Sequence, residues 1–423
     1  MPKSPIPIPL DNLQDLRRVL WEVRIAVGSH ARIILWKSDV KSAYRLMPMS
    51  PFWQIKQVVK IDGRFNVDRC NNFGGRTSGN VWGVFFSLVL WIATFVKLIT
   101  DVHGFVDDVF SWDVEGNMVL YGPYDTYYPS KQAHFLLLLD ELGIPHDKAK
   151  QLCGSKFTII GFEVDANAMT ITMPDDGRRD LIAAIRFFAI MGRRPTLNDY
   201  QRLAGWINWS LNVYPLLHPG LSTLYAKTAG KSLSHWEIYV NKQLCRELLW
   251  IANYLETAPP IFMMDSVDWP LHFAEYTLYT DACLFGMGFW SPSHSLGFQS
   301  PVDTNARTIF YWEAYAVLSA FYWLAHHRHP PPHRVAIFTD NMNTVHMFHS
   351  LRATPEYNPI LMTTVEIMMT FNIQLQVVHI PGEQNVVADA LSRFNNHYLS
   401  SSYPALHIRN FQPPHLSMGA EFL

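Results

Sequence analysis

The stretch "GFVDDVF", residues 104–110, places two adjacent aspartates, Asp107 and Asp108, at the centre of an otherwise apolar run. One interpretation is a β-hairpin whose two-residue turn carries both acids into solvent. The other is a binding site at a strand tip, where two carboxylates repel each other until a divalent cation such as Mg²⁺ neutralises them. The rest of the sequence has to decide between a solvated turn and a metal site.

The composition is that of ordinary globular domains. The chain has 423 residues, of which 49% are hydrophobic and 17% charged, which predicts two or three domains with a sizeable core. Because 34 Lys and Arg face 36 Asp and Glu, the net charge is −2, so any contact with nucleic acid has to come from a local patch. The cysteines form no CxxC pair, which argues against a zinc site or a disulfide framework and indicates a reducing compartment.

Targeting signals are not recognisable in the sequence. The start, "MPKSPIPIPL", contains no apolar segment or cleavage site of the kind that secretion signals have. The run "VWGVFFSLVLWIATFV", residues 81–96, is shorter than the roughly 18 residues of a membrane span. We therefore expect an intracellular chain, cytoplasmic or nuclear and not secreted, with no membrane partner and with a buried core helix at residues 81–97.

Periodicity divides the chain into three parts. Strand-like and helix-like segments alternate over residues 33–162, which indicates an α+β domain, and residues 175–256 read as helical. Prolines mark residues 257–270 as a linker, and the remainder alternates strands and helices up to a Ser-, Pro- and His-rich tail that begins near residue 395. Two helical faces stand out, one formed by Leu197, Tyr200, Leu203 and Ile207, the other by Ala314, Val317, Leu318, Phe321 and Leu324.

A third acid, Asp39, ends the strand-like segment "RIILWKSDV". Neighbouring strands of one sheet can bring Asp39 next to Asp107 and Asp108. Three carboxylates at adjoining strand ends would hold two metal ions about 3.5 to 4 Å apart, the arrangement that supports phosphoryl transfer.

The flanking segments carry a family resemblance. In this order, the chain contains "WKSDVKSAYRLMPM", "NNFGGRTSGNVWGVF", "GFVDDVF", "LGIPHDKAK" and "FTIIGFEVD". The series resembles the palm of reverse transcriptases from retroelements, and the resemblance implies that Asp39, Asp107 and Asp108 bind the catalytic metals. Fewer than forty residues precede Asp39, so we expect this chain to lack most of the fingers subdomain that the resemblance implies.

The same resemblance implies several substrate-binding residues. Tyr44 would exclude the ribose 2′-OH of an incoming nucleotide, and Lys150 would lie near the triphosphate. A core aromatic and a surface lysine are the respective alternatives. The residues that would position nucleotide and template are Phe73, Gly74 and Ser78, and Phe105 stands where the family usually has tyrosine.

Four acids stand out in the last third of the chain. They are Asp281 in "LYTDAC", Glu313 in "YWEAYAV", Asp340 in "IFTDNMNTV" and Asp389 in "NVVADALSR". Acids on a first strand, near a helix start, after a central strand and on a last helix can converge at one end of a sheet, which would form a two-metal hydrolytic site. Asp389 alone is also compatible with a simple helix-start residue.

These strings, with "HIPGEQNVVADALSR" (379–393) the most specific, resemble ribonuclease H of retrotransposons. The resemblance implies metal binding by the four acids. It also implies that His379 assists proton transfer or product release, unless it is a structural histidine at a strand end, and that Asn341 contacts the hybrid.

Between the two domains, "YQRLAGWINWSLNVYPLLHPGLSTLY" resembles the thumb or connection of the same elements. Its aromatic residues are suited either to stacking on bases or to core packing; they are Trp206, Trp209, Tyr214 and Tyr225.

Together, these patterns predict an α+β reverse transcriptase palm with truncated fingers (residues 1–165), a helical thumb or connection (166–262), an α/β ribonuclease H-like domain with a mixed five-stranded sheet (273–395) and a loose tail (396–423). The resemblance implies an RNA-directed DNA polymerase with ribonuclease H activity from a retrotransposon, with two Mg²⁺ or Mn²⁺ ions per active site. Its expected partners are an RNA template, a DNA primer, RNA/DNA hybrid and dNTPs. The alternative is a truncated or domesticated remnant that binds nucleic acid without polymerising.

Overall fold

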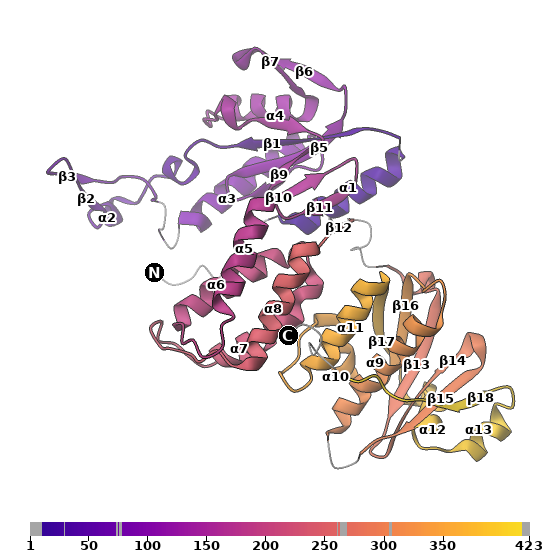
Figure 1. Ribbon diagram of the computed structural model, residues 1–423. Helices are drawn as coiled ribbons and strands as arrows, with labels where there is room; N and C mark the ends of the chain where they lie inside the picture. Colours follow the sequence, from indigo (N-terminus) through magenta and orange to yellow (C-terminus); the bar gives the residue numbers. More distant parts are fainter. Residues whose placement is uncertain are drawn as a thin grey trace. The chain divides into compact units, whose positions relative to one another are not determined.

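The computed structural model describes residues 11–28, 30–72, 75, 78–259, 261–262, 269–303 and 307–416 (Figure 1). Contacts between residues divide the chain into two units. The first consists of residues 1–174 and 259–267, and the second of residues 175–258 and 268–423. The helical segment predicted as a thumb or connection is thus grouped largely with the C-terminal part of the chain.

The first unit is built on a four-stranded sheet in the order β4-β5-β1-β8. Its strands are β1 (Ile33–Asp39), β4 (His103–Phe105), β5 (Asp108–Val114) and β8 (Leu152–Gly154). Strand β1 is central and pairs antiparallel with both β5 and β8. Because Ile33, Leu35 and Trp36 are all nearly inaccessible to solvent, both faces of this strand are covered.

Helices pack against this sheet. They are α3 (Ser78–Trp91) and α4 (Ser130–Glu141), while helix α1 (Leu13–Val27) precedes β1 in the chain. Helix α1 begins at a capping box in which the Asn12 side chain accepts from the backbone of the first turn. A buried cluster joins Trp36 of β1, Val109 of β5, Trp82 and Phe86 of α3, and Phe135 of α4. This shared core fixes the ends of β1 and β5 relative to each other.

Helix α3 differs from the predicted fully buried helix. It continues into a π-helical turn, Ile92–Val96, and only one face, with Trp82, Phe86, Val89 and Ala93, is buried. The opposite face exposes large apolar side chains; these include Val84, Leu88, Trp91 and Phe95. By length and composition, residues 78–96 form the one described helix that is apolar enough to cross a membrane, a test that core helices also pass.

Smaller elements complete the first unit. They are α2 (Pro51–Gln54), the hairpin β2 (Val58–Ile61) and β3 (Arg64–Val67), the hairpin β6 (Met118–Tyr121) and β7 (Thr126–Pro129), and a second sheet of β9 (Lys156–Ile159), β10 (Phe162–Asp165), β11 (Thr170–Thr172) and β12 (Ile261–Phe262). In the predicted linker 257–270, residues 261–262 therefore pair with β11, whereas residues 260 and 263–268 lie outside the described residues.

The second unit begins with four helices: α5 (Asp175–Phe188), α6 (Leu197–Ser210), α7 (Ser222–Thr228) and α8 (Lys242–Thr257). The predicted inner face of α6 is confirmed, because Leu197, Tyr200, Leu203 and Ile207 are all buried.

A six-stranded mixed sheet in the order β17-β16-β13-β14-β15-β18 forms the rest of this unit (Figure 1). Its strands are β13 (Tyr276–Ala282), β14 (Gly286–Ser291), β15 (Leu296–Pro301), β16 (Arg334–Thr339), β17 (Gln374–His379) and β18 (His407–Asn410). The accompanying helices are α9 (Ile309–His327), α10 (Met342–Ser350), α11 (Asn358–Phe371), α12 (Val386–Ser392) and α13 (Asn396–Ser402). The predicted inner face of α9, from Ala314 to Leu324, is fully buried.

The prediction of five strands and a loose tail needs correction. Strand β18, which lies in the predicted tail, pairs parallel with the otherwise free edge of β15. The described part of the predicted tail, residues 396–416, buries apolar side chains: Leu399 is inaccessible to solvent, and the Phe411 ring packs 4.9 Å from that of Phe289. The pairing with the sheet edge and this burial stabilise the segment, although its polar composition had suggested a loose tail.

We predict that Phe321→Ala destabilises the second unit by about 3 to 5 kcal/mol, because it leaves a cavity in the core around α9. Phe187→Ala is the matched control, since that ring is 68% exposed, and should cost less than about 1 kcal/mol. Urea unfolding of the full chain measures both. Equal effects of the two substitutions would contradict this assignment of the core.

Candidate active sites

The first candidate centre lies where β1 ends beside the β4–β5 hairpin. The antiparallel register places Asp39 directly opposite Asp108, and Phe105 also faces Asp108 across the hairpin. The opening stretch therefore forms a β-hairpin, but not the predicted turn of two solvated acids: the turn consists of Val106 and Asp107, Asp108 already belongs to β5, and both acids are half-buried.

The turn that carries Asp107 is strained and firmly held. Val106 has a φ of 60°, a conformation that is unfavourable for a β-branched residue and is found mainly where a structure requires it. The indole nitrogen of Trp82 donates to the Val106 carbonyl at 2.6 Å, and the Val40 amide donates to the Asp107 carbonyl at 3.3 Å. Helix α3 and the residue after Asp39 thus fix the position of Asp107.

Two lysines neutralise part of this centre. Lys150 Nζ lies 2.8 Å from Asp39 Oδ2, and Lys37 Nζ lies 2.7 Å from Asp108 Oδ2. Burial raises the pKa of Asp107, and the neighbouring charges of Asp39 and Asp108 raise it further. The structure therefore brings all three predicted acids to one place. Lys37 was not predicted, although its position two residues before Asp39 on the same face of β1 was a usable signal.

The predicted substrate-binding residues of the first unit can be placed only in part. Tyr44 is half-buried in a short 3₁₀ turn, Ala43–Leu46, and its pKa is raised by burial and by the charge of Asp107. Ser78 is buried at the start of α3. Phe73 and Gly74 lie outside the described residues.

The second candidate centre brings together three of the four predicted acids of the second unit. Asp281 is the penultimate residue of β13, Glu313 lies in the first turns of α9, and Asp340 directly follows β16. Within the described part of the chain, they form the one group of three whose ligand atoms all lie within 4.8 Å of one another. Asp281 and Glu313 are only 4% and 5% exposed, so the cluster is closed to solvent on one side.

The cluster has the electrostatics of a cation site. Burial raises the pKa of Asp281 to about 7, and the charges of Asp340 and Asp389 add to the effect. Burial, with the charges of Asp281 and Asp340, raises the pKa of Glu313 to about 9. The buried Oε2 of Glu313 has no hydrogen-bond partner. Because uncompensated buried carboxylates are costly and Mg²⁺ prefers oxygen ligands, these residues fit a divalent cation.

The remaining predicted residues of this centre lie around the three acids. Asp389, on α12, is part of the surrounding charge but accepts from Arg393 Nε at 2.7 Å. His379 ends β17 and is exposed. Burial raises the pKa of the neighbouring Asp340, and the interaction with His379 partly counteracts this shift. Asn341 accepts from the Thr344 amide as the N-cap of α10, so its carbonyl oxygen has a structural partner.

Sequence reasoning missed the contacts that follow Asp389. Ser392 Oγ donates to Asp281 Oδ2 at 2.5 Å, and Arg393 pairs with Asp389 itself. Both residues lie in "ADALSR", the end of the most specific motif in the chain, but neither was predicted as a site residue. An acid followed three residues later by a serine on one helix face was the available signal.

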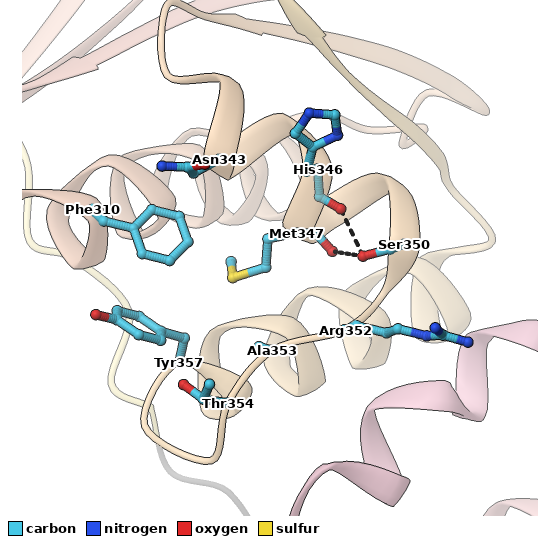
Figure 2. Close-up of a pocket in the computed structure, with 9 residues that line it drawn as sticks. All are labelled: Phe310, Asn343, His346, Met347, Ser350, Arg352, Ala353, Thr354 and Tyr357. Carbon is cyan, nitrogen blue, oxygen red and sulfur yellow. Dashed lines mark hydrogen bonds between the residues drawn. The ribbon is translucent and has the colours of Figure 1, made fainter. Parts of the chain in front are cut away.

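A cavity of about 310 Å³ lies between α10 and the segment that leads into α11 (Figure 2). Its lining contains no carboxylate, so it is separate from the acid cluster. The side chains around it include the rings of Phe310 and Tyr357, whose centroids are 4.7 Å apart, and the polar groups of Asn343, His346 and Arg352.

The aromatic residues of the helical segment have different environments. Tyr214 is buried at 2% exposure, whereas Trp206, Trp209 and Tyr225 are 37–40% exposed. Tyr214 is therefore a core residue, whereas the other three rings lie at the surface.

No protein-family model matches the sequence, and no curated protein matches it. Among solved structures, the chain is similar to the foamy viral protease-reverse transcriptase dRH in complex with double-stranded DNA, with a TM-score of 0.41, 14% identity, and coverage of 89% of this chain and 60% of that chain.

Two further foamy viral protease-reverse transcriptase structures are similar to this chain. The complex with an RNA/DNA hybrid has a TM-score of 0.39, 12% identity and coverage of 93% and 70%; the complex with double-stranded DNA has 0.40, 14%, and 92% and 71%. This chain thus spans about 60 to 71% of those proteins. At this distance the likeness does not establish a family, and the function has to be inferred from the residues themselves.

The raised pKa values predict a pH dependence of stability in EDTA. Unfolded carboxyl groups titrate near pH 4, whereas Asp281 and Glu313 titrate at about 7 and 9 in the folded chain. Between these values the folded chain binds more protons than the unfolded chain, so the free energy of unfolding should fall as the pH rises from about 4 to about 9.

Glu313→Gln should flatten this decline and, at pH 8, stabilise the metal-free chain by about 1 to 3 kcal/mol. Glu356→Gln is the control, because Glu356 is about half exposed. Urea unfolding in EDTA at pH 5, 7 and 9 measures the slope. An unchanged slope in Glu313→Gln would show that Glu313 is already ionised.

Proposed function

We propose that the second unit is a ribonuclease H-like nuclease that cleaves the RNA strand of RNA/DNA hybrids and depends on divalent cations. The observation that carries this proposal is the buried cluster of Asp281, Glu313 and Asp340 at one end of a mixed sheet. The order of the four acidic motifs along the chain, ending in "HIPGEQNVVADALSR", supports the same reaction.

The roles of the residues follow from their positions. Asp281, Glu313 and Asp340, with Asp389 from α12, would hold two Mg²⁺ or Mn²⁺ ions, which would activate a water and stabilise the leaving oxygen. Exposed His379, whose charge acts on Asp340, would accept or deliver a proton at the edge of the centre. Asn341, two residues from the cavity residue Asn343, would contact the hybrid through its side-chain amide nitrogen while its oxygen caps α10.

We propose further that the first unit is the palm of an RNA-directed DNA polymerase from a retrotransposon. Asp39, Asp107 and Asp108 would bind the metals that activate a primer 3′-OH. Lys150 would exchange its contact with Asp39 for the triphosphate of a dNTP, and half-buried Tyr44, near Asp107, would discriminate against a ribose. Phe105, Ser78, Phe73 and Gly74 would position nucleotide and template. The division at residues 165, 262 and 395 into palm, thumb, ribonuclease H-like domain and tail belongs to this proposal.

The exposed face of helix α6 is suited to contact with nucleic acid. Its exposed face carries Arg202 and the rings of Trp206 and Trp209. Gly205 lies between them, and an added Cβ there would meet no atom within 4 Å. A glycine in a helix costs about 1 kcal/mol relative to alanine, and packing within the chain does not require one at position 205. A glycine there would allow an RNA template, a DNA primer or their hybrid to approach the helix backbone closely.

The alternative is a remnant that binds nucleic acid without polymerising. The observation in its favour is that Lys37 and Lys150 already pair with two of the three acids of the first centre. Such lysines can replace metal ions as counter-charges and keep the fold after polymerisation has been lost.

Asp340→Asn should abolish cleavage of a labelled RNA/DNA hybrid in Mg²⁺, lowering the rate by at least about 100-fold, because it removes a metal ligand. Glu356→Gln should cleave at the rate of the unmodified chain. Gel analysis of cleavage products is the measurement. If a folded, unmodified chain shows no cleavage, the nuclease proposal fails.

Asp107→Asn should abolish primer extension on an RNA template and leave hybrid cleavage unchanged, because the two centres lie in separate units. Extension and cleavage are measured on the same preparation. Extension that survives this substitution would show that the metal assignment of the first unit is wrong. An unmodified chain that binds a primer-template but never extends it would favour the remnant.

A further inference from the structure

Helix α12, which carries Asp389, is attached to strand β13 by a side chain at each of its ends. At the N-terminal end, Asn385 Nδ2 donates to the Thr280 carbonyl at 2.9 Å. At the C-terminal end, Ser392 Oγ donates to Asp281 Oδ2 at 2.5 Å. Asn385 and Ser392 are 1% and 0% exposed, and their partners are consecutive residues of one strand.

The C-terminal attachment requires an unusually close approach of helix and sheet. The β13–β14 register places Gly288 directly opposite Asp281, so both residues face α12. A Cβ at Gly288 would lie 2.6 Å from Leu391 Cβ and 2.8 Å from the Ser392 amide nitrogen. At Gly286, a Cβ would lie 2.2 Å from the Ser392 carbonyl oxygen. Both glycines are therefore needed for Ser392 to reach Asp281.

Further contacts hold the same end of the helix. Cys283 Sγ, two residues after Asp281, donates to the Ser392 carbonyl at 3.2 Å. Leu391, next to Ser392, is fully buried in a small core with Val387, Ala390 and Leu399. The Ser392 hydroxyl is thus fixed in position as well as buried, as is typical of groups that orient a metal ligand from behind.

We propose that Asn385 and Ser392 are positioning residues for the second centre, a two-point clamp that holds Asp281 in its orientation and sets Asp389 against the three-acid cluster. This inference rests on the proposed nuclease function. Asn385 acts on the placement of α12, and Ser392 acts on α12 and on the Asp281 carboxylate at once. Neither residue touches the reacting atoms.

The clamp predicts a defect in metal affinity. Ser392→Ala removes the donor to Asp281 and should raise the half-saturating Mg²⁺ concentration for hybrid cleavage by about 10- to 100-fold, with most of the rate recovered at high Mg²⁺. Asn385→Ala tests the other end independently and should shift the Mg²⁺ dependence in the same direction. Ser319→Ala is the matched control, because Ser319 is 1% exposed and donates only to the Tyr315 carbonyl of its own helix.

A second readout does not depend on cleavage. Mn²⁺ binding to the full chain is followed by electron paramagnetic resonance in an Asp107→Asn background, which weakens the first centre. Ser392→Ala should raise the dissociation constant for Mn²⁺ by the same factor as the half-saturating Mg²⁺ concentration, while its urea midpoint stays close to that of Ser319→Ala.

The outcomes separate the clamp from the nuclease. If Ser392→Ala and Asn385→Ala both bind and use metal as Ser319→Ala does, the clamp is refuted and the nuclease stands. If Mn²⁺ binding weakens as expected but no variant, including the unmodified chain, cleaves hybrid, the clamp is supported and the nuclease proposal fails. If the unmodified chain binds no Mn²⁺ at its second centre, both are refuted.

Discussion

The candidate site of the second unit depends on three carboxylates that the fold holds together in a buried place without a lysine or arginine partner among the described residues. Asp281 and Asp340 lie near the ends of the neighbouring strands β13 and β16, and Glu313 joins them from the first turns of α9. Such an arrangement costs folding free energy, because burial and mutual repulsion disfavour the ionised forms. Folded proteins retain such a destabilising arrangement where a functional site requires it, and this is the basis on which we propose metal-dependent chemistry.

The two units differ in how the charges of their clustered acids are balanced. In the first unit, Lys37 and Lys150 pair with Asp108 and Asp39, so two of three charges are balanced by the chain itself. In the second, the nearest described ion pair involves Asp389 and Arg393 and leaves the inner acids without a lysine or arginine partner. Under the proposed function, the second centre would rely on an external cation for its charge balance, whereas in the first centre a metal ion would have to displace the lysines.

Much of this arrangement was predictable from the sequence, because local patterns determine it. Helical spacing identified the buried faces of α6 and α9, and the acids marked both centres. Long-range pairing was not predictable, because β18 pairs with β15, a strand about a hundred residues earlier in the chain. The contacts of Lys37 with Asp108 and of Ser392 with Asp281 likewise join residues that are far apart in the sequence. The exposed face of α3 was missed for a related reason, since a continuous apolar run does not show which side has a partner.

The most direct measurement is anomalous diffraction from crystals of the full chain grown with an RNA/DNA hybrid and soaked in Mn²⁺. The account predicts Mn²⁺ density enclosed by Asp281, Glu313, Asp340 and Asp389, with a second group of peaks beside Asp39 and Asp107. Well-ordered crystals with Mn²⁺ bound elsewhere and none at Asp281, Glu313 and Asp340 would contradict it, and the buried acids would then need an explanation other than metal-dependent catalysis.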